Sequence, residues 1–382
     1  MPRISLWAVA LLSLFLAGCS QLEQRADLPE KKPLIAIEAP IKINRKWIKD
    51  TGAGTDHKDI KLLLAAEGIN LYTADANGNL MAINRTSGAT VWTTALKAKV
   101  SAGPAIGDGK LVVGTNDGRV IAVDINNGKI VWLSRSTSEI LAAPYITNDM
   151  VLIHTMDGGL SALSLLDGRQ LWRYTHNLPP LMLRRSSTPI VRGDVIIAGF
   201  ANGKLLAMRK NDGSIIWVQD VSQPKGSTDL QRMIDISADP VIVGNRVYAA
   251  SYQGNIAAID FDTGNVIWER SLPSFSGLVV DQEFIYEAGT NGDVVAIDSN
   301  NGVTYWLQNE LQGRLLSKPA VMGKYLIVAD KDGNVHWLEK ATGKLVGRFE
   351  LDKGGIEATP IVIGKIVYIL GCGGSLVALE ID

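Results

Sequence analysis

Side chains with the chemistry for catalysis or metal binding are few in this sequence of 382 residues. There are 2 Cys, at positions 19 and 372, and 4 His, at positions 57, 154, 176 and 336. None of the histidines stands beside a Cys or a second His at the spacing of a zinc or haem site. The sequence also lacks a G-x-S-x-G nucleophile motif, a phosphate-binding glycine loop followed by Lys-Ser/Thr, and a zincin helix. We therefore predict no catalytic residue, no bound cofactor and no metal site, and a protein that is not an enzyme.

Cys19 is the cysteine with the most informative context. It follows Arg3 and an apolar run of 14 residues, Ile4–Ala17. That run is shorter than the roughly 20 residues of a membrane-crossing helix and is typical of a secretory signal. The segment Leu16-Ala-Gly-Cys19 resembles the bacterial lipobox, which implies cleavage before Cys19 and acylation of this residue.

The residues after Cys19 predict where the protein is attached. Ser20 stands where lipoproteins retained in the inner membrane usually carry Asp, so the resemblance implies the outer membrane, at its periplasmic face. Residues 20–40 contain three Pro and no apolar period. We expect a signal peptide over 1–18, a lipidated Cys19 with a flexible tether over 19–40, and one folded domain over 41–382.

Composition narrows the class of that domain. The sequence is 46% hydrophobic and 20% charged, with 38 Lys+Arg against 39 Asp+Glu and a net charge of −1. This is a globular composition, and it provides no basic field that would attract nucleic acid. The 38 Gly and 9 Trp need a structural explanation.

An internal repeat provides that explanation. Each copy contains a turn Gly, an alternating run, a second turn Gly and a terminal Trp, as in ANGNLMAINRTSGATVW (76–92) and NDGRVIAVDINNGKIVW (116–132). Successive tryptophans from Trp92 to Trp306 are 40, 40, 45, 51 and 38 residues apart. This period, with Asn-Gly and Asp-Gly turns between β-branched runs, is typical of four-stranded propeller blades. The Asp-Ile-Asn-Asn-Gly segment at 124–128 is interpreted as a hairpin turn, because it lacks the final Glu of a calcium loop.

The two ends of the repeat predict how the ring closes. Residues 356–382 supply only three strands, whereas 41–50 has the alternation and the Trp of a fourth. Pairing of 41–50 with 374–382 would remove an open edge. We predict an all-β fold, an eight-bladed propeller of four-stranded antiparallel blades whose last blade is closed by an N-terminal strand; a seven-bladed ring with an extra strand is the alternative. In the seventh copy Gly347 replaces the Trp, and Trp337 lies elsewhere in the repeat.

The pattern Ala-x-Asp/Asn-x-x-x-Gly-x-x-x-Trp, seen from Ala82 to Trp92 and from Ala296 to Trp306, resembles the tryptophan-docking repeat of quinoprotein dehydrogenases. With the lipobox, the eight-blade length and no appended domain, the chain resembles the propeller lipoproteins of the outer-membrane β-barrel assembly machinery. That resemblance implies a non-catalytic scaffold that binds the POTRA domains of the barrel-forming subunit and aids insertion of outer-membrane proteins, with unfolded outer-membrane proteins as further clients. A quinone-binding oxidoreductase or redox accessory lipoprotein is the alternative. Those dehydrogenases carry a vicinal disulfide, and this sequence has no Cys-Cys pair.

Two long intervals interrupt the repeat and are candidates for the partner site. The first, 177–188, begins with Asn-Leu-Pro-Pro and places large apolar residues beside two Arg. Apolar groups next to Arg on a rigid scaffold are typical of interface hot spots, although Leu181 and Leu183 could instead begin a buried strand. The second interval is 219–239. The resemblance assigns partner binding to Leu181, Leu183, Arg184 and Asp235, whereas Ser237 stands where a second acidic residue is expected.

Overall fold

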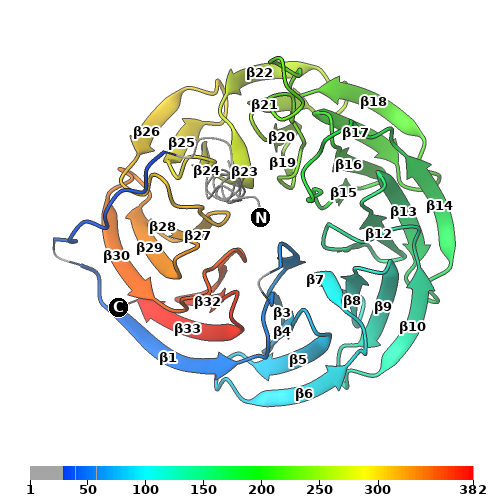
Figure 1. Cartoon of the computed structure of the whole chain (residues 1–382), viewed down its shortest axis with the longest axis horizontal. Coiled ribbons are helices and arrows are strands. Elements are labelled where there is room, and N and C mark those ends of the chain that lie inside the picture. Colours follow the sequence, from blue (N-terminus) through cyan, green and yellow to red (C-terminus); the bar gives the residue numbers. More distant parts are fainter. Residues whose placement is uncertain (1–28, 39, 57, 382) are drawn as a thin grey trace, which may run out of the picture.

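In the computed structural model, eight antiparallel β-sheets surround a central axis like the blades of a propeller (Figure 1). The structure describes residues 29–381 apart from 39 and 57. The predicted all-β, eight-bladed fold is confirmed. Within the described ranges there is no helix with the length and apolarity that crossing a membrane requires.

The blades are numbered in chain order, and each has its first strand nearest the axis. Blades 1 to 4 contain β3 (Ala65–Glu67), β4 (Asn70–Ala74), β5 (Asn79–Asn84) and β6 (Thr90–Ala95); β7 (Val100–Gly107), β8 (Lys110–Thr115), β9 (Arg119–Asp124) and β10 (Ile130–Arg135); β11 (Tyr145–Ile146), β12 (Met150–His154), β13 (Gly159–Ser164) and β14 (Gln170–Thr175); and β15 (Ile190–Arg192), β16 (Val195–Gly199), β17 (Lys204–Arg209) and β18 (Ile215–Asp220). A short strand, β2 (Lys61–Leu62), adds to blade 2 by parallel pairing with β7.

Blades 5 to 8 repeat this arrangement. They contain β19 (Val241–Val243), β20 (Arg246–Ala250), β21 (Asn255–Asp260) and β22 (Val266–Ser271); β23 (Ser274–Asp281), β24 (Phe284–Gly289), β25 (Val294–Asp298) and β26 (Thr304–Gln308); β27 (Ala320–Met322), β28 (Tyr325–Ala329), β29 (Asn334–Glu339) and β30 (Leu345–Glu350); and β31 (Ile361–Ile363), β32 (Ile366–Leu370), β33 (Ser375–Ile381) and β1 (Ile43–Asp50).

The up-and-down order of each blade sorts its connections between two faces of the ring. Turns between the second and third strands, and the connections from one blade to the next, emerge on one face, which we call the loop face. Turns between the first and second strands and between the third and fourth emerge on the other, the turn face. Both long intervals, 176–189 after β14 and 221–240 after β18, therefore lie on the loop face.

Seven tryptophans at the same position of the outer strands join each blade to the next. Their indole N–H groups donate to main-chain carbonyl oxygens at 2.8–3.0 Å: Trp47 to Arg85, Trp92 to Ile125, Trp132 to Leu165, Trp172 to Lys210, Trp217 to Phe261, Trp268 to Ser299 and Trp306 to Lys340. Each ring also covers a turn glycine of the next blade. At Gly128, where φ is +70°, a Cβ would lie 2.6 Å from the Trp92 ring. The repeated Gly is therefore required by its positive φ and by the indole above it.

In blade 7 the large and the small residue of one cross-strand pair are exchanged between the third and fourth strands. In the other blades the outer Trp is paired across the sheet with an Ala, as Trp92 is with Ala82. In blade 7 the pair is Trp337 on β29 and Gly347 on β30, and Trp337 is fully buried. The space beside Gly347 is filled from outside by Ile41, whose side chain would lie 2.8 Å from a Cβ on Gly347. The missing docking Trp is therefore replaced by an inward Trp and an outer isoleucine.

Blade 8 combines the two ends of the domain. β1 pairs antiparallel with β33, from Ile43 opposite Ile381 to Asp50 opposite Ser375. In Figure 1 the blue β1 accordingly lies outside the red β33. The predicted closure of the last blade by an N-terminal strand is confirmed.

The segment before β1 lies against the outside of blades 6 and 7 (Figure 1). Its main chain is bonded at Lys32 N to Gln312 O, 3.0 Å, and Lys31 forms an ion pair with Asp332 at 3.0 Å. Leu34 packs into the apolar cluster between these blades. Residues 29–38, which fall within the range expected to be a tether, thus contact the propeller where the structure describes them.

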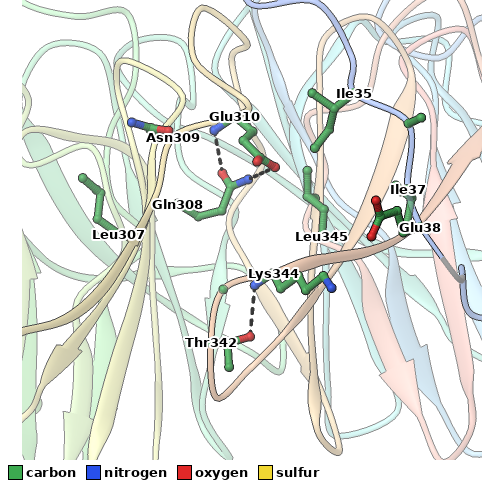
Figure 2. A pocket seen from close by; sticks show the side chains of 12 residues that line it. Ile35, Ile37, Glu38, Leu307, Gln308, Asn309, Glu310, Thr342, Lys344 and Leu345 are labelled. Carbon is green, nitrogen blue, oxygen red and sulfur yellow. Dashed lines mark hydrogen bonds between the residues drawn. The ribbon is translucent and has the colours of Figure 1, made fainter.

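A polar groove lies between this segment and the two blades. Figure 2 shows Ile35, Ile37 and Glu38 on one wall, with Gln308 on β26 and Leu345 on β30 opposite. The groove has a volume of about 390 Å³. The N-terminal segment therefore crosses from the loop face, at Lys31, to the turn face, where Ile41 N donates to Val346 O at 2.8 Å.

Candidate partner-binding site

The four residues assigned to a partner by resemblance come from the two long connections of the loop face. Leu181, Leu183 and Arg184 lie in the connection between β14 and β15. Asp235 lies in the connection between β18 and β19. The structure brings the two connections into direct contact, because the main-chain N–H of Leu183 donates to Asp235 Oδ2. The four residues therefore belong to one composite surface.

Within this surface Asp235 is a buried residue. Its side chain is 1% exposed, and its second oxygen accepts from Asn202 N at 3.3 Å. Burial raises the pKa of Asp235 to about 6, although the Leu183 N–H opposes the shift. A carboxylate in this position ties the first connection to the second and does not present its charge to solvent. Ser237 is also buried.

The other three residues are accessible to different degrees. Leu181 is 43% exposed, and Leu178 nearby in the chain is 40% exposed, whereas Leu183 is half-buried. The two exposed leucines lie three residues apart in the same connection. This part of the connection thus offers an apolar contact surface, and it does not continue as a core strand.

Arg184 is exposed but already engaged within the chain. Its guanidinium forms a 2.5 Å ion pair with Glu139 and donates to Asp59 O at 3.0 Å. Glu139 belongs to the connection between blades 2 and 3, and Asp59 to the connection between blades 8 and 1. Arg184 is therefore held in a fixed position, which lowers the entropy cost of presenting it to another protein.

Further ion pairs join connections from opposite sides of the ring. Arg185, after blade 3, contacts Asp59 at 2.6 Å and Glu357, before blade 8, at 2.5 Å. Lys61 on β2 contacts Asp239, before blade 5, at 2.6 Å. Lys61, Arg185, Asp239 and Glu357 line a shared cavity of about 280 Å³. Ion pairs therefore link connections of the loop face that belong to blades on opposite sides of the ring.

The supporting acidic residues were missed from the sequence. Nothing in the spacing of Asp59, Glu139 or Glu357 relates them to Arg184 or Arg185, because they are contributed by distant blades. The aromatic partner of Arg185 was missed for the same reason: its guanidinium carbon lies 4.6 Å from the centre of the Phe275 ring. Cys19 lies outside the described residues.

The fold and this surface define a class: an eight-bladed, tryptophan-docked propeller with its longest connections gathered on one face. The profile of the family described as "Outer membrane protein assembly factor BamB" matches residues 76–308 and 290–382. Together with the relatives described next, this match shows that the chain belongs to the BamB family of outer membrane protein assembly factors.

Relatives with that description extend over nearly the whole chain. The protein of Legionella pneumophila is 41% identical over 98% of both chains, and that of Pseudomonas aeruginosa is 42% identical over 98% of both. The protein of Escherichia coli K12 is 31% identical, covering 92% of this chain and 93% of its own.

Solved structures agree in fold. BamB from Moraxella catarrhalis superposes with a TM-score of 0.81 at 25% identity, covering 89% of this chain and 100% of that one. A europium-containing methanol dehydrogenase superposes with a TM-score of 0.74 at 14% identity, covering 88% and 93%. The second likeness concerns the fold alone.

Proposed function

We propose that this chain is a non-catalytic scaffold of outer-membrane protein assembly, which docks through its loop face on the POTRA domains of a barrel-forming subunit. The observation that carries the proposal is the exposed Leu181 beside a pre-positioned Arg184 on connections that are tied together. Apolar and Arg side chains held on a rigid scaffold are the usual components of a hot spot.

Within this site the residues have different roles. Leu181 and Arg184 make direct contact with the partner, and Leu183 shapes the loop between them. Asp235 is a positioning residue, because its carboxylate is buried and acts on the partner through the Leu183 main chain. The proposed partner surface on the POTRA domains is an acidic patch next to an apolar one.

Attachment to the outer membrane is the second part of the proposal. Acylation of Cys19 would hold the propeller at the periplasmic face. Ten residue steps separate Cys19 from Pro29, which limits the span to about 35 Å. Pro29 and Lys31 lie against Gly313 on the loop face at blades 6 and 7, and the partner connections follow blades 3 and 4. The anchor and the partner site would thus use the same face at different parts of the ring.

A binding experiment tests the partner site. Leu181→Asp combined with Arg184→Glu should reduce recovery of purified POTRA domains at least tenfold. The matched control is Leu166→Asp with Arg169→Glu, which makes the same changes at exposed positions of a turn-face hairpin. Both variants should retain the circular dichroism spectrum of the parent. Unchanged recovery by the folded loop-face variant would refute the site.

The alternative of a quinone-binding oxidoreductase is tested separately. Pyrroloquinoline quinone, added with and without Ca²⁺, should produce no saturable change in absorbance or in intrinsic Trp fluorescence. Stoichiometric, quinone-dependent binding would favour the alternative over a scaffold.

A further inference from the structure

A group of buried oxygen atoms without hydrogen-bond partners lies at the loop-face end of blade 6. Among the described residues, these atoms are both carboxylate oxygens of Glu287, Oγ of Ser274 and Oδ1 of Asp293. Glu287 and Ser274 are each 0% exposed. Leaving a buried polar group without a partner is unfavourable, and more so when the group is charged. Several such atoms together indicate a missing positive partner.

One of these oxygens, Glu287 Oε2, lies near the Cα of Gly289 together with two oxygens of the turn that follows β24. An atom at the position of a Cβ on Gly289 would lie 2.9 Å from Asn291 Oδ1, 3.6 Å from Asp293 O and 3.7 Å from Glu287 Oε2. These are its three nearest neighbours. Ser274 is opposite Gly289 in the sheet. Asn291 and Asp293 are half-buried and lie in the loop-face turn between β24 and β25.

Two of these oxygens have spare capacity for a ligand. Asn291 Oδ1 accepts from Asp293 N at 3.0 Å, and Asp293 O accepts from Gly289 N at 2.8 Å. A carbonyl oxygen has two lone pairs, so each retains one. The turn is already satisfied by its own bonds, and the Glu287 carboxylate is not needed to hold it.

Other blades fill the corresponding place differently. Blade 7 has Asp330 at the position of Gly289, and this buried carboxylate is neutralised by Arg314 at 3.1 Å and His336 at 2.9 Å. In the described part of the chain, no Lys, Arg or His side chain is hydrogen-bonded to Glu287. Blade 6 thus has two carboxylates and no counter-charge.

We propose that Glu287, Asp293, Asn291 and Ser274 form a binding site for a calcium ion. All the candidate ligands are hard oxygens: carboxylate, amide, hydroxyl and main-chain carbonyl, and the two carboxylates balance a divalent charge. Ca²⁺ accepts six to eight oxygen ligands in flexible geometry and completes its shell with water, which suits a site supplied by only two acidic residues. Mg²⁺ requires a tighter octahedron and is the poorer fit.

The bound ion would have a structural effect at a defined place. It would join the start of β23, the end of β24 and the turn that follows, beside the boundary with blade 5, where Ser274 N donates to Ser251 O at 3.2 Å. This site is separate from the partner surface at blades 3 to 5. The proposal does not depend on the proposed function.

Calorimetric titration and thermal unfolding test the site in the purified chain after treatment with a chelator. At 5 mM CaCl₂ the midpoint of unfolding should rise by about 2–4 °C relative to NaCl of equal ionic strength, and titration should give one ion per chain. Glu287→Gln should lose both effects. Glu283→Gln, which removes an exposed carboxylate from the same blade, should keep them.

Three results would overturn the proposal. These are the absence of heat and of a midpoint shift with CaCl₂, an equal shift with MgCl₂, and a calcium response that persists in Glu287→Gln. Because Glu287→Gln keeps the side-chain shape and places no charge in the buried site, the variant should fold, and its circular dichroism spectrum and its midpoint in chelator will establish this.

Discussion

Asp235→Asn should change how the stability of the propeller depends on pH. Asp235 is fully buried, and its pKa is about 6 in the folded chain against an ordinary value of 3.8. The folded state therefore binds the proton more tightly than the unfolded state. Protonated Asp235 therefore contributes to stability at low pH, and this contribution is lost as the pH rises through 6. Asn cannot titrate, so the variant lacks this contribution at every pH.

The size of the effect follows from the two pKa values. Between pH 5 and pH 7 the titration of Asp235 lowers the free energy of unfolding by about 1 kcal/mol. Other buried groups also make the stability depend on pH, including Glu287, whose pKa is raised to about 8, and His154, whose pKa is lowered to about 4, in both cases by burial. They affect parent and variant equally. The comparison of the two proteins therefore isolates Asp235.

Urea unfolding at pH 5 and pH 7, followed by Trp fluorescence, measures this difference. The parent should gain about 1 kcal/mol in its free energy of unfolding between pH 7 and pH 5, and Asp235→Asn should not. The difference between variant and parent therefore becomes about 1 kcal/mol more destabilising at pH 5 than at pH 7. Asp229→Asn, an exposed carboxylate in the same connection, should show no such change. Identical pH dependence in the parent and in Asp235→Asn would refute the assignment of a raised pKa to this buried carboxylate.

Three further predictions concern packing and reactivity. Gly128→Ala should lower the free energy of unfolding by about 2–4 kcal/mol, whereas Gly109→Ala, at the same φ of +70° but with open space around it, should cost about 1 kcal/mol; equal losses in urea unfolding would contradict a specific role for the indole contact. Trp337→Ala should cost about 3–5 kcal/mol and Trp337→Phe clearly less, because Trp337 is fully buried opposite Gly347; a neutral Trp337→Ala in the same assay would show that this indole is not needed. Burial raises the pKa of the Cys372 thiol to about 11, so its alkylation by iodoacetamide at pH 7.5 should be about 100-fold slower than in urea; equal rates by mass spectrometry would exclude this.

The blade architecture could be predicted because its determinants are local and repeated. A docking Trp and a turn Gly recur at fixed positions, and the truncated last copy implied a strand from the other end, which β1 supplies. The exchange in blade 7 also left a signal, since Trp337 stands where other copies have Ala and Gly347 stands where they have Trp. If Trp337 and Gly347 are interpreted as one cross-strand pair, the buried position of the Trp337 indole can be predicted from the sequence.

The loop face was less predictable for a physical reason. Whether an Asp is exposed or buried depends on what the neighbouring connection places over it, and Asp235 is covered by the main chain at Leu183. The ion partners of Arg184 belong to other blades, so no spacing along the chain relates them. Likewise, composition indicated a tether for 19–40, whereas contacts such as that of Lys31 with Asp332 depend on the assembled surface.

The composite eighth blade has a consequence for the order of events during folding. Lys46 on β1 and Glu380 beside it on β33 are 334 residues apart in the chain. β1 emerges early during synthesis, yet its partner strand is among the last, so the ring remains open until synthesis of the chain is almost complete. Contacts at such separation form slowly, because loop closure must precede them. The interval before closure, when the edge of β33 and the apolar side of β1 are unpaired, is thus the period when this chain most needs protection from aggregation.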